Sequence, residues 1–100
     1  MLGREDILKQ LQENAEKIRS LGVKRLSLFG SYAQEKQQAQ SDIDFLVDFE
    51  QGRGLFDDYI QLQELLENLF EKNVDLVKTH LVREELREDI FSGKQYEAKI

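Results

Sequence analysis

Apolar residues recur at two different spacings along the chain, and the spacing predicts which segments are helices and which are strands. Apolar positions three or four residues apart run from about Arg4 to Leu21 and again from Leu55 to Phe70, which is typical of amphipathic helices. Gly22 follows the first of these segments, where a left-handed residue commonly ends a helix. Short apolar runs predict three strands, at residues 24–29, 43–49 and 74–78.

The remaining segments complete an alternation of helices and strands. A short helix is expected directly after Gly30 and Ser31, and the spacing of Leu81, Leu86 and Ile90 suggests a final helix. Such an alternation predicts an α/β (α+β) protein in which one small sheet is covered by helices. One hundred residues suffice for one small domain.

Two aspartates, Asp42 and Asp44, stand at the start of the second predicted strand. Alternate residues of a strand point to one face, so these two side chains should project side by side, about 7 Å apart. Two carboxylates so placed repel each other unless a cation lies between them. Gly30 and Ser31 form a turn after the neighbouring strand, and such a turn into a helix is suited to hold a phosphate. The constellation indicates metal-dependent chemistry on a nucleotide.

The acidic residues also have simpler explanations. Asp42 could belong to a solvated turn, but this does not explain Asp44, because carboxylates are disfavoured in strands that bury one face. Asp75, alone in a short apolar strand, could point at solvent. Asp48 lies on the face of Asp44 but about 13 Å further along, which favours a surface charge over a ligand.

The remaining candidates have simpler explanations too. Gly30 could serve only the backbone of a turn, and Ser31 could be only the N-cap of the following helix. His80, the one histidine of the chain, is more often a surface or capping residue when it stands alone at a strand–helix junction. We therefore do not place His80 in the predicted site.

Charge and composition restrict the partners. The 14 Lys and Arg residues are outnumbered by 20 Asp and Glu, which gives a net charge of −6. No block of consecutive basic residues occurs, so template-directed binding to nucleic acid is not expected. The absence of cysteine excludes disulfides and thiolate metal sites. No apolar run approaches the roughly 18 residues of a membrane span, so a cytoplasmic protein outside the membrane is expected.

The motifs together resemble those of the minimal nucleotidyltransferases of the DNA polymerase beta superfamily. They are Gly30-Ser31, a ten-residue spacer, Asp42-x-Asp44 and Asp75 in Val-Asp-Leu-Val. The resemblance covers nearly the whole chain. It implies that residues 1–100 form one minimal nucleotidyltransferase domain with a small mixed β-sheet of about three or four strands. It also implies the reaction, in which a hydroxyl attacks the α-phosphorus of a nucleoside triphosphate and pyrophosphate departs.

The resemblance also implies a role for each site residue. Asp42 and Asp44 would hold two metal ions, Asp75 would complete the site of the ion that activates the hydroxyl and would take its proton, and Gly30 and Ser31 would bind the triphosphate of ATP. Ligands that are all oxygen favour Mg²⁺, with Mn²⁺ as the alternative. Two such ions stabilise both the attacking and the leaving oxygen of an in-line displacement.

One departure from the family pattern bears on the strength of this activity. Relatives commonly have Arg-Gly where this chain has Gln34-Glu35. The exchange removes a cation and adds an anion beside the triphosphate site, which should weaken nucleotide binding. Lys36 and Arg53 are the two cations that could substitute for the missing arginine.

The resemblance finally implies a partner. Minimal nucleotidyltransferases are typically paired with a HEPN-domain protein as antitoxin to its toxin, and some adenylylate a tyrosine of that partner. Protein adenylyltransferase and antitoxin is therefore the first hypothesis. The second is a non-catalytic module that neutralises the HEPN partner by contact, and the third is a transferase for a small-molecule hydroxyl. Because few helices cover the sheet, association with a helical partner or with itself is expected.

Overall fold

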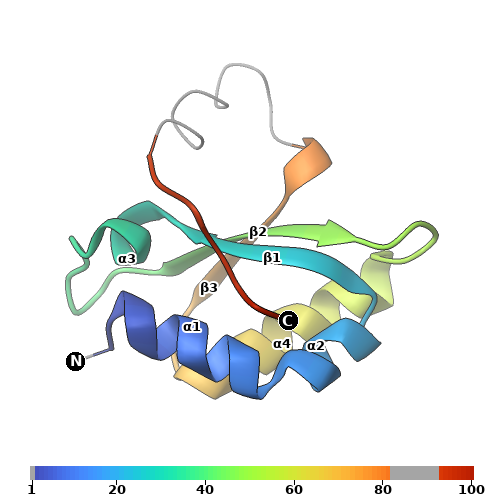
Figure 1. Ribbon diagram of the computed structural model, residues 1–100, viewed down its shortest axis with the longest axis horizontal. Coiled ribbons are helices and arrows are strands. Elements are labelled where there is room, and N and C mark those ends of the chain that lie inside the picture. Colours follow the sequence, from blue (N-terminus) through green and yellow to red (C-terminus); the bar gives the residue numbers. More distant parts are fainter. Residues whose placement is uncertain (1, 82–92) are drawn as a thin grey trace.

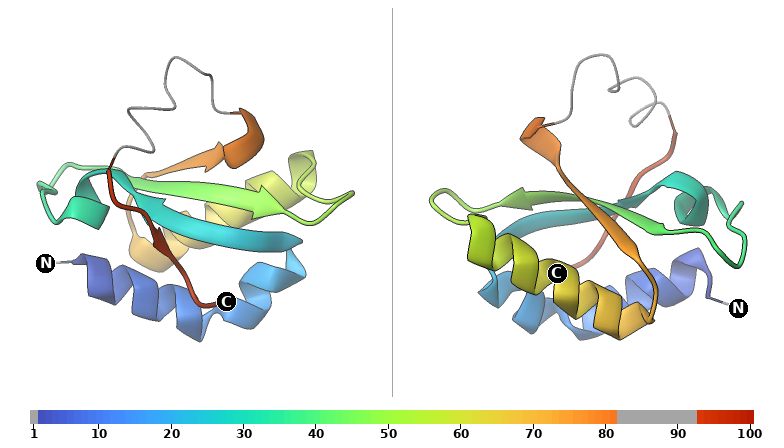
Figure 2. Two further views of the ribbon diagram at one scale, coloured as in Figure 1. Left: turned by 45° about the horizontal axis from the view of Figure 1, so that its top comes forward. Right: turned by 180° about the vertical axis from the view of Figure 1, so that it is seen from behind.

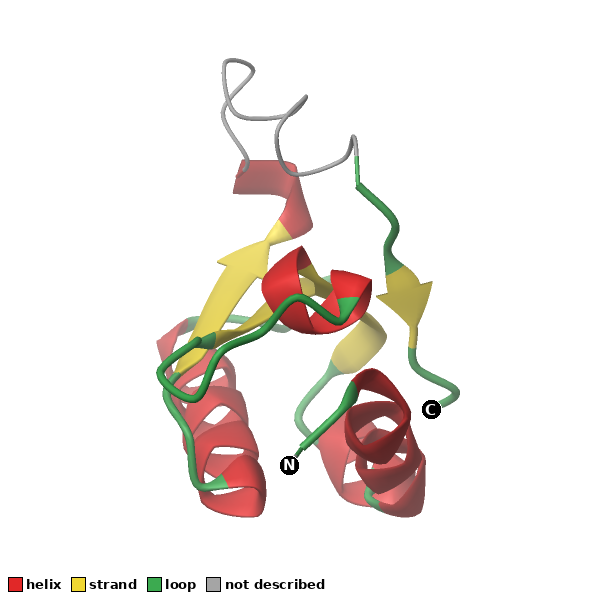
Figure 3. Ribbon diagram, turned by 90° about the vertical axis from the view of Figure 1, so that its left-hand side faces the viewer, coloured by secondary structure: helices red, strands yellow, loops and turns green. Residues whose placement is uncertain are grey.

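In its described residues the protein consists of one β-sheet with helices packed on one side of it. The computed structural model describes residues 2–81 and 93–100. The helices in these residues are α1 (Arg4–Glu13), α2 (Ala15–Ser20), α3 (Gly30–Gln34), α4 (Phe56–Phe70) and the short 3-10 helix η1 (Thr79–Leu81). Helices α1, α2 and α4 lie on the same side of the sheet (Figure 3), and α3 lies at one end of it (Figure 1). The alternation of helix and strand read from the sequence is confirmed up to η1.

The described strands form a mixed sheet. They are β1 (Val23–Phe29), β2 (Ile43–Phe49), β3 (Val74–Lys78) and β4 (Tyr96–Glu97), in the order β3-β2-β1-β4. Strand β2 runs parallel to β3, whereas β1 is antiparallel to both β2 and β4. The C-terminal segment that contains β4 crosses beside β1 (Figure 2). This arrangement confirms the expected mixed sheet of three or four strands.

The core lies between the sheet and the three helices on its one side. The strands contribute the alternate residues expected of a half-buried sheet, and α4 contributes residues four apart. These fully or almost fully buried side chains are Leu26 and Leu28 of β1, Ile43, Phe45 and Val47 of β2, and Leu62, Leu66 and Phe70 of α4. The rings of Phe45 and Phe70 stack with centroids 6.1 Å apart. No helix in the described ranges is long and apolar enough to cross a bilayer.

The first helix differs from the prediction. The sequence predicted one helix from Arg4 to Leu21, but the structure contains two, with a break at Asn14. The side chain of Asn14 donates a hydrogen bond to the carbonyl of Gln10 at 2.8 Å, and its backbone N–H is shared between Gln10 and Leu11. Asparagine competes with the helical backbone in this way, and apolar spacing alone does not reveal it. The predicted final helix (Leu81, Leu86 and Ile90) lies largely outside the described residues.

The loop between β2 and α4 is held by one charged pair. The guanidinium of Arg53 donates two hydrogen bonds to Asp58, at 2.9 and 3.0 Å, and a third to the carbonyl of Ser20 at 3.1 Å. The backbone N–H of Gly54 donates to the same carboxylate at 2.9 Å. The hydrogen bonding from Arg53, which has the largest effect, and the bond from Gly54 lower the pKa of Asp58 to about 2. The sequence left open whether Arg53 substitutes for the missing arginine at the phosphate site. The structure shows that Arg53 instead closes this loop.

Candidate functional site

Strand pairing brings together the acidic residues that the sequence placed in two separate strands. The parallel pairing of β2 with β3 sets Asp44 directly opposite Asp75, and the antiparallel pairing with β1 sets Phe29 opposite Asp44 on the other side. Because Phe45 faces the helices and is buried, Asp44 and Asp75 lie on the opposite face of the sheet. The expected placement of Asp75 next to Asp44 is confirmed.

Gly30 leaves room for Asp44. Its φ is +77°, which L-residues with a side chain rarely adopt, and a Cβ atom built on it would lie 2.2 Å from Oδ2 of Asp44. The simpler explanation for this glycine, backbone freedom at a turn, is therefore correct but incomplete. For Ser31 the simpler explanation is wrong, because α3 begins at Gly30 and its N-cap is Phe29. Ser31 lies within the first turn of that helix.

The negative charge at this edge of the sheet has no salt-bridge partner among the residues that the structure describes. Partial burial first, and then the carboxylates of Asp75 and of Asp42 in that order, together raise the pKa of Asp44 to about 6. Asp42 precedes β2 and, like Asp75, is exposed to solvent. The three predicted carboxylates thus act on one another electrostatically. A cation between them would remove the repulsion.

The donor set fits a hard divalent cation in its chemistry. The three groups are carboxylates, which Mg²⁺ and Mn²⁺ prefer over nitrogen or sulfur ligands. In the described part of the chain, however, no three acidic, histidine or cysteine side chains stand close enough together to hold a metal ion as they are placed. Asp42 and Asp75 are exposed, so changes of rotamer are open to both. The assignment of metal to Asp42, Asp44 and Asp75 stays a prediction.

Two further residues near the acidic edge were not singled out by the sequence pattern. Tyr59 is half-buried and packs against the core, and its hydroxyl donates to the carbonyl of Leu76. Burial and then the charge of Asp75 raise the pKa of Tyr59, so it stays a proton donor. Lys72 lines a cavity of about 540 Å³ that also borders Asp42. A single lysine in the turn before β3 carries no signal in the sequence.

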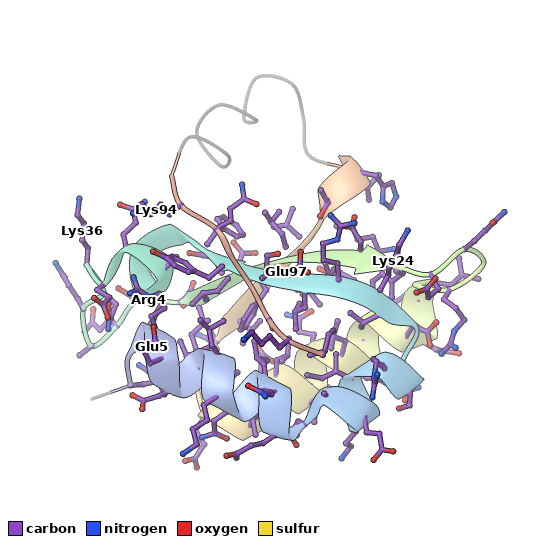
Figure 4. All side chains as sticks on the ribbon, in the orientation of Figure 1. Arg4, Glu5, Lys24, Lys36, Lys94 and Glu97 are labelled. Atoms are coloured by element: carbon purple, nitrogen blue, oxygen red, sulfur yellow. The ribbon has the colours of Figure 1, made fainter. Side chains whose placement is uncertain are left out.

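The other candidate residues lie away from the acidic edge or contribute no contact to it. His80 is exposed in η1, beyond the far end of β3 from Asp75, as expected of a surface residue. Lys36 follows α3 and is exposed at that end of the molecule (Figure 4). Glu35 ends α3 in the left-handed conformation, with φ of 57° and ψ of 38°. Glycine adopts that conformation without steric cost.

The fold and the acidic edge define a class of protein: nucleotidyltransferases built on a small mixed sheet. The family model described as Polymerase beta, Nucleotidyltransferase matches residues 5–96. The chain belongs to this family and is a nucleotidyltransferase. Its recognition from the sequence is thereby confirmed.

Curated relatives with similar sequences carry names of the same class. The protein adenylyltransferase MntA of Thermococcus cleftensis is 36% identical over 97 residues, which cover 91% of this chain and 97% of the relative. A protein of Methanocaldococcus jannaschii, provisionally named a protein adenylyltransferase, is 41% identical over 71 residues, which cover 71% of this chain and 75% of the relative.

Solved structures share the fold. A protein provisionally named a minimal nucleotidyltransferase superposes with a TM-score of 0.67 at 32% identity, covering 93% of this chain and 95% of the other. A chain of a toxin–antitoxin complex with AMP-PNP gives 0.66 at 26% identity, covering 98% and 75%. A chain of the tri-AMPylated Shewanella oneidensis HEPN toxin in complex with MNT antitoxin gives 0.60 at 21% identity, covering 92% and 73%, and shows the fold alone.

Proposed function

We propose that this chain is a metal-dependent protein adenylyltransferase that transfers AMP from ATP to a tyrosine hydroxyl of a HEPN-domain toxin and thereby acts as its antitoxin. The observation that carries the proposal is the register of the sheet, which sets Asp44 opposite Asp75 and beside Gly30. The names of the adenylyltransferase relatives and the AMP-PNP in the toxin–antitoxin neighbour support the reaction and its nucleotide.

Each site residue has a distinct task in this reaction. Gly30 and Ser31 bind the triphosphate at the start of α3. Asp42 and Asp44 would hold two Mg²⁺ ions, or Mn²⁺ in their place, and Asp75 would complete the site. Bound divalent cations neutralise the charge between the triphosphate and the carboxylates. Asp75 accepts the proton of the attacking hydroxyl, which makes the oxygen a better nucleophile toward the α-phosphorus of ATP.

Exposed apolar side chains support a protein partner. Leu55 and Phe56, at the start of α4, have 73% and 78% of their surface exposed, and Leu81 has 65%. Large apolar side chains placed this way favour an interface with another protein. The toxin–antitoxin complex with AMP-PNP, one chain of which is 26% identical to this one, supports a toxin as the partner. A nucleic acid is not proposed as substrate, because the chain has a net charge of −6.

Contact alone is the second candidate for the antitoxin function. Gln34 stands where the resemblance to the family implies an arginine, and its amide nitrogen lies 2.8 Å from the position that a Cβ on Gly93 would occupy. The side chain of Gln34 thus lies against the C-terminal segment and brings no positive charge to a triphosphate. A weak or inactive site would leave binding as the means of neutralisation. A small-molecule hydroxyl as acceptor is the third candidate.

Radioactive transfer separates these candidates. The protein is incubated with its toxin partner, Mg²⁺ and ATP labelled in the α-phosphate, and the label on the partner is measured together with the activity of the toxin. With the parent we expect label on a tyrosine of the partner. With Asp44→Asn we expect the amount of label on the partner to fall by at least a hundredfold. If Asp44→Asn neutralises the toxin as well as the parent does, contact and not transfer is the antitoxin mechanism. Glu64→Gln, on the exposed surface of α4, controls for removal of a carboxylate.

A further inference from the structure

A second cavity lies on the same face of the sheet as Asp44. It encloses about 290 Å³, and its lining includes Ser27 and Leu46, which are register partners on β1 and β2. Leu46 is the next residue after Asp44 on this face, and alternate residues of a strand are about 7 Å apart. The cavity therefore begins about one such step from the acidic edge. At about 30 Å³ for each water molecule, its volume suits a side chain better than a single ion.

Charged residues form the rim of this cavity. Arg25 stands opposite Asp48 in the register, and its Nε atom is 3.9 Å from Oδ2 of Asp48 and 3.8 Å from Oε1 of Glu97. Glu97 belongs to the C-terminal strand that crosses beside β1 (Figure 4). One guanidinium is thus shared between two carboxylates, at distances longer than a hydrogen bond. Among the lining residues within 2–81 and 93–100, the rim has one negative charge in excess.

This excess charge discriminates between the possible occupants. A nucleoside triphosphate carries several negative charges, so Asp48 and Glu97 disfavour it. The hydroxyl that receives the nucleotide has to reach the edge formed by Asp44 and Asp75, and an extended polypeptide places side chains two residues apart about 7 Å from each other. This spacing equals the step from Asp44 to the cavity. A polypeptide along this face would therefore place a second side chain in the cavity.

We propose that this cavity, which we call the acceptor pocket (Arg25, Ser27, Leu46, Asp48 and Glu97), holds a basic side chain two residues from the acceptor tyrosine of the protein substrate. The inference rests on the proposed adenylyl transfer and adds the substrate feature that the enzyme selects. The cationic end of the side chain lies between Asp48 and Glu97, where it supplies the positive charge that Arg25 alone does not. Its aliphatic part packs on Leu46.

The test uses three short peptides that contain one tyrosine and differ only two residues away, where they carry Arg, Ala or Glu. Transfer of AMP from ATP in the presence of Mg²⁺ gives kcat/KM for each peptide, and equilibrium binding is measured separately with AMP-PNP. For the parent we expect the Arg peptide to exceed the Glu peptide by about tenfold or more in both measurements. In Glu97→Lys the preference should vanish or reverse, while KM for ATP stays within about twofold.

The matched control is Glu64→Lys, which makes the same change of charge at an exposed position of α4, on the helical side of the sheet. This variant should keep the preference of the parent. If Glu97→Lys does not fold, Glu97→Gln, which removes the charge without reversing it, should still abolish the preference for Arg over Glu. Equal use of the three peptides by the parent, or a preference that survives both changes at Glu97, overturns the acceptor pocket.

Failure of the pocket and failure of the proposed reaction are distinguishable. Transfer to all three peptides without selectivity would remove the pocket and leave adenylyl transfer in place. Selective binding of the Arg peptide without transfer to any peptide or partner would remove the reaction and support the pocket as a binding site for basic segments.

Discussion

Asp44 and Asp58 both lie against a glycine with positive φ, yet their surroundings shift their pKa values in opposite directions. Asp58 accepts hydrogen bonds from Arg53 and from the backbone of Gly54, and its pKa falls to about 2. Asp44 is partly buried beside Gly30 with two other carboxylates near it, and its pKa rises to about 6. One carboxylate is compensated within the fold, whereas the other is not.

This difference separates a structural aspartate from a candidate functional one. A compensated carboxylate stabilises the fold and offers nothing to a ligand. An uncompensated one costs stability, and such residues are common at catalytic and binding sites, where a ligand or cation supplies the missing charge. Asp44 is therefore a candidate for the site, because no residue that the structure describes compensates its charge, whereas Asp58 is compensated by Arg53 and holds a loop.

The largest expected effect on stability comes from Gly30→Ala. A residue with a Cβ atom pays about 1–2 kcal/mol for positive φ, and here that atom would also meet Oδ2 of Asp44 at 2.2 Å. We expect a loss of about 2–4 kcal/mol, which lowers Tm by about 4–8 °C per kcal/mol. Gly52→Ala is the control, since Gly52 has φ of +80° but nothing within 4 Å of its Cβ position. Equal losses for the two variants would show that Asp44 does not press on Gly30.

Replacing the two aspartates by asparagine should change stability in opposite directions. In EDTA at pH 8, Asp44→Asn removes repulsion and should stabilise the protein, by up to about 1 kcal/mol once solvent screening of this partly exposed group is allowed for. Asp58→Asn weakens the pair with Arg53 and should lower Tm. Denaturant unfolding of both variants and the parent measures the signs. Shifts of the same sign would contradict the comparison.

The pH dependence of these differences should also be opposite. The pKa of Asp44 is raised from 3.8 to about 6, so its favourable contribution is present when it is protonated, below about pH 4, and is lost as the pH rises through 6. The advantage of Asp44→Asn should therefore appear between pH 4 and 6 and stay constant above. Asp58, with its pKa lowered to about 2, contributes above about pH 4 and loses this as the pH falls toward 2. Thermal melts of the parent, Asp44→Asn and Asp58→Asn from pH 3 to 8 measure both pH dependences.

The smallest expected effect is at the end of α3. Glu35 has φ of 57°, and Glu35→Gly should stabilise the protein by about 0.5–1 kcal/mol, because relief of the left-handed strain exceeds the added freedom of the unfolded chain. Glu71→Gly, at φ of 52° after α4, should give a similar gain far from Ser31. A change in ATP binding for Glu35→Gly alone would show that the residue also acts on the nucleotide. A loss of stability in both variants would contradict the argument that the left-handed conformation strains Glu35 and Glu71.

The sequence predicted the positions of Asp44 and Asp75 in the sheet better than their surroundings. The spacing of Asp42 and Asp44 follows from the two-residue period of a strand, and a neighbouring strand for Asp75 follows from the resemblance to a known family. The contact of Gly30 with Asp44 could not be predicted, because it depends on the register between β1 and β2. Lys72 likewise has no local pattern that marks it.

The fold shows the same limits. Long periodic segments were located well, and β2 has the predicted bounds of residues 43–49. The break at Asn14 depends on one side-chain hydrogen bond, and β4 is two residues long and exists through pairing with β1. Neither the break at Asn14 nor strand β4 produces a periodic pattern of apolar residues that would predict it. The expected roles in metal and phosphate binding are predictions that solution experiments can test.

The most direct test of the acidic edge is the effect of Mg²⁺ with ATP on thermal stability of the parent and of Asp44→Asn. Ligands that bind only the folded state stabilise it by RT ln(1 + [L]/Kd), about 2.7 kcal/mol at a hundredfold excess over Kd. For a domain of this size the account predicts a rise in Tm on the order of 10–20 °C for the parent, and little rise for Asp44→Asn. Equal rises in the two proteins would contradict the assignment of Asp44 to the site.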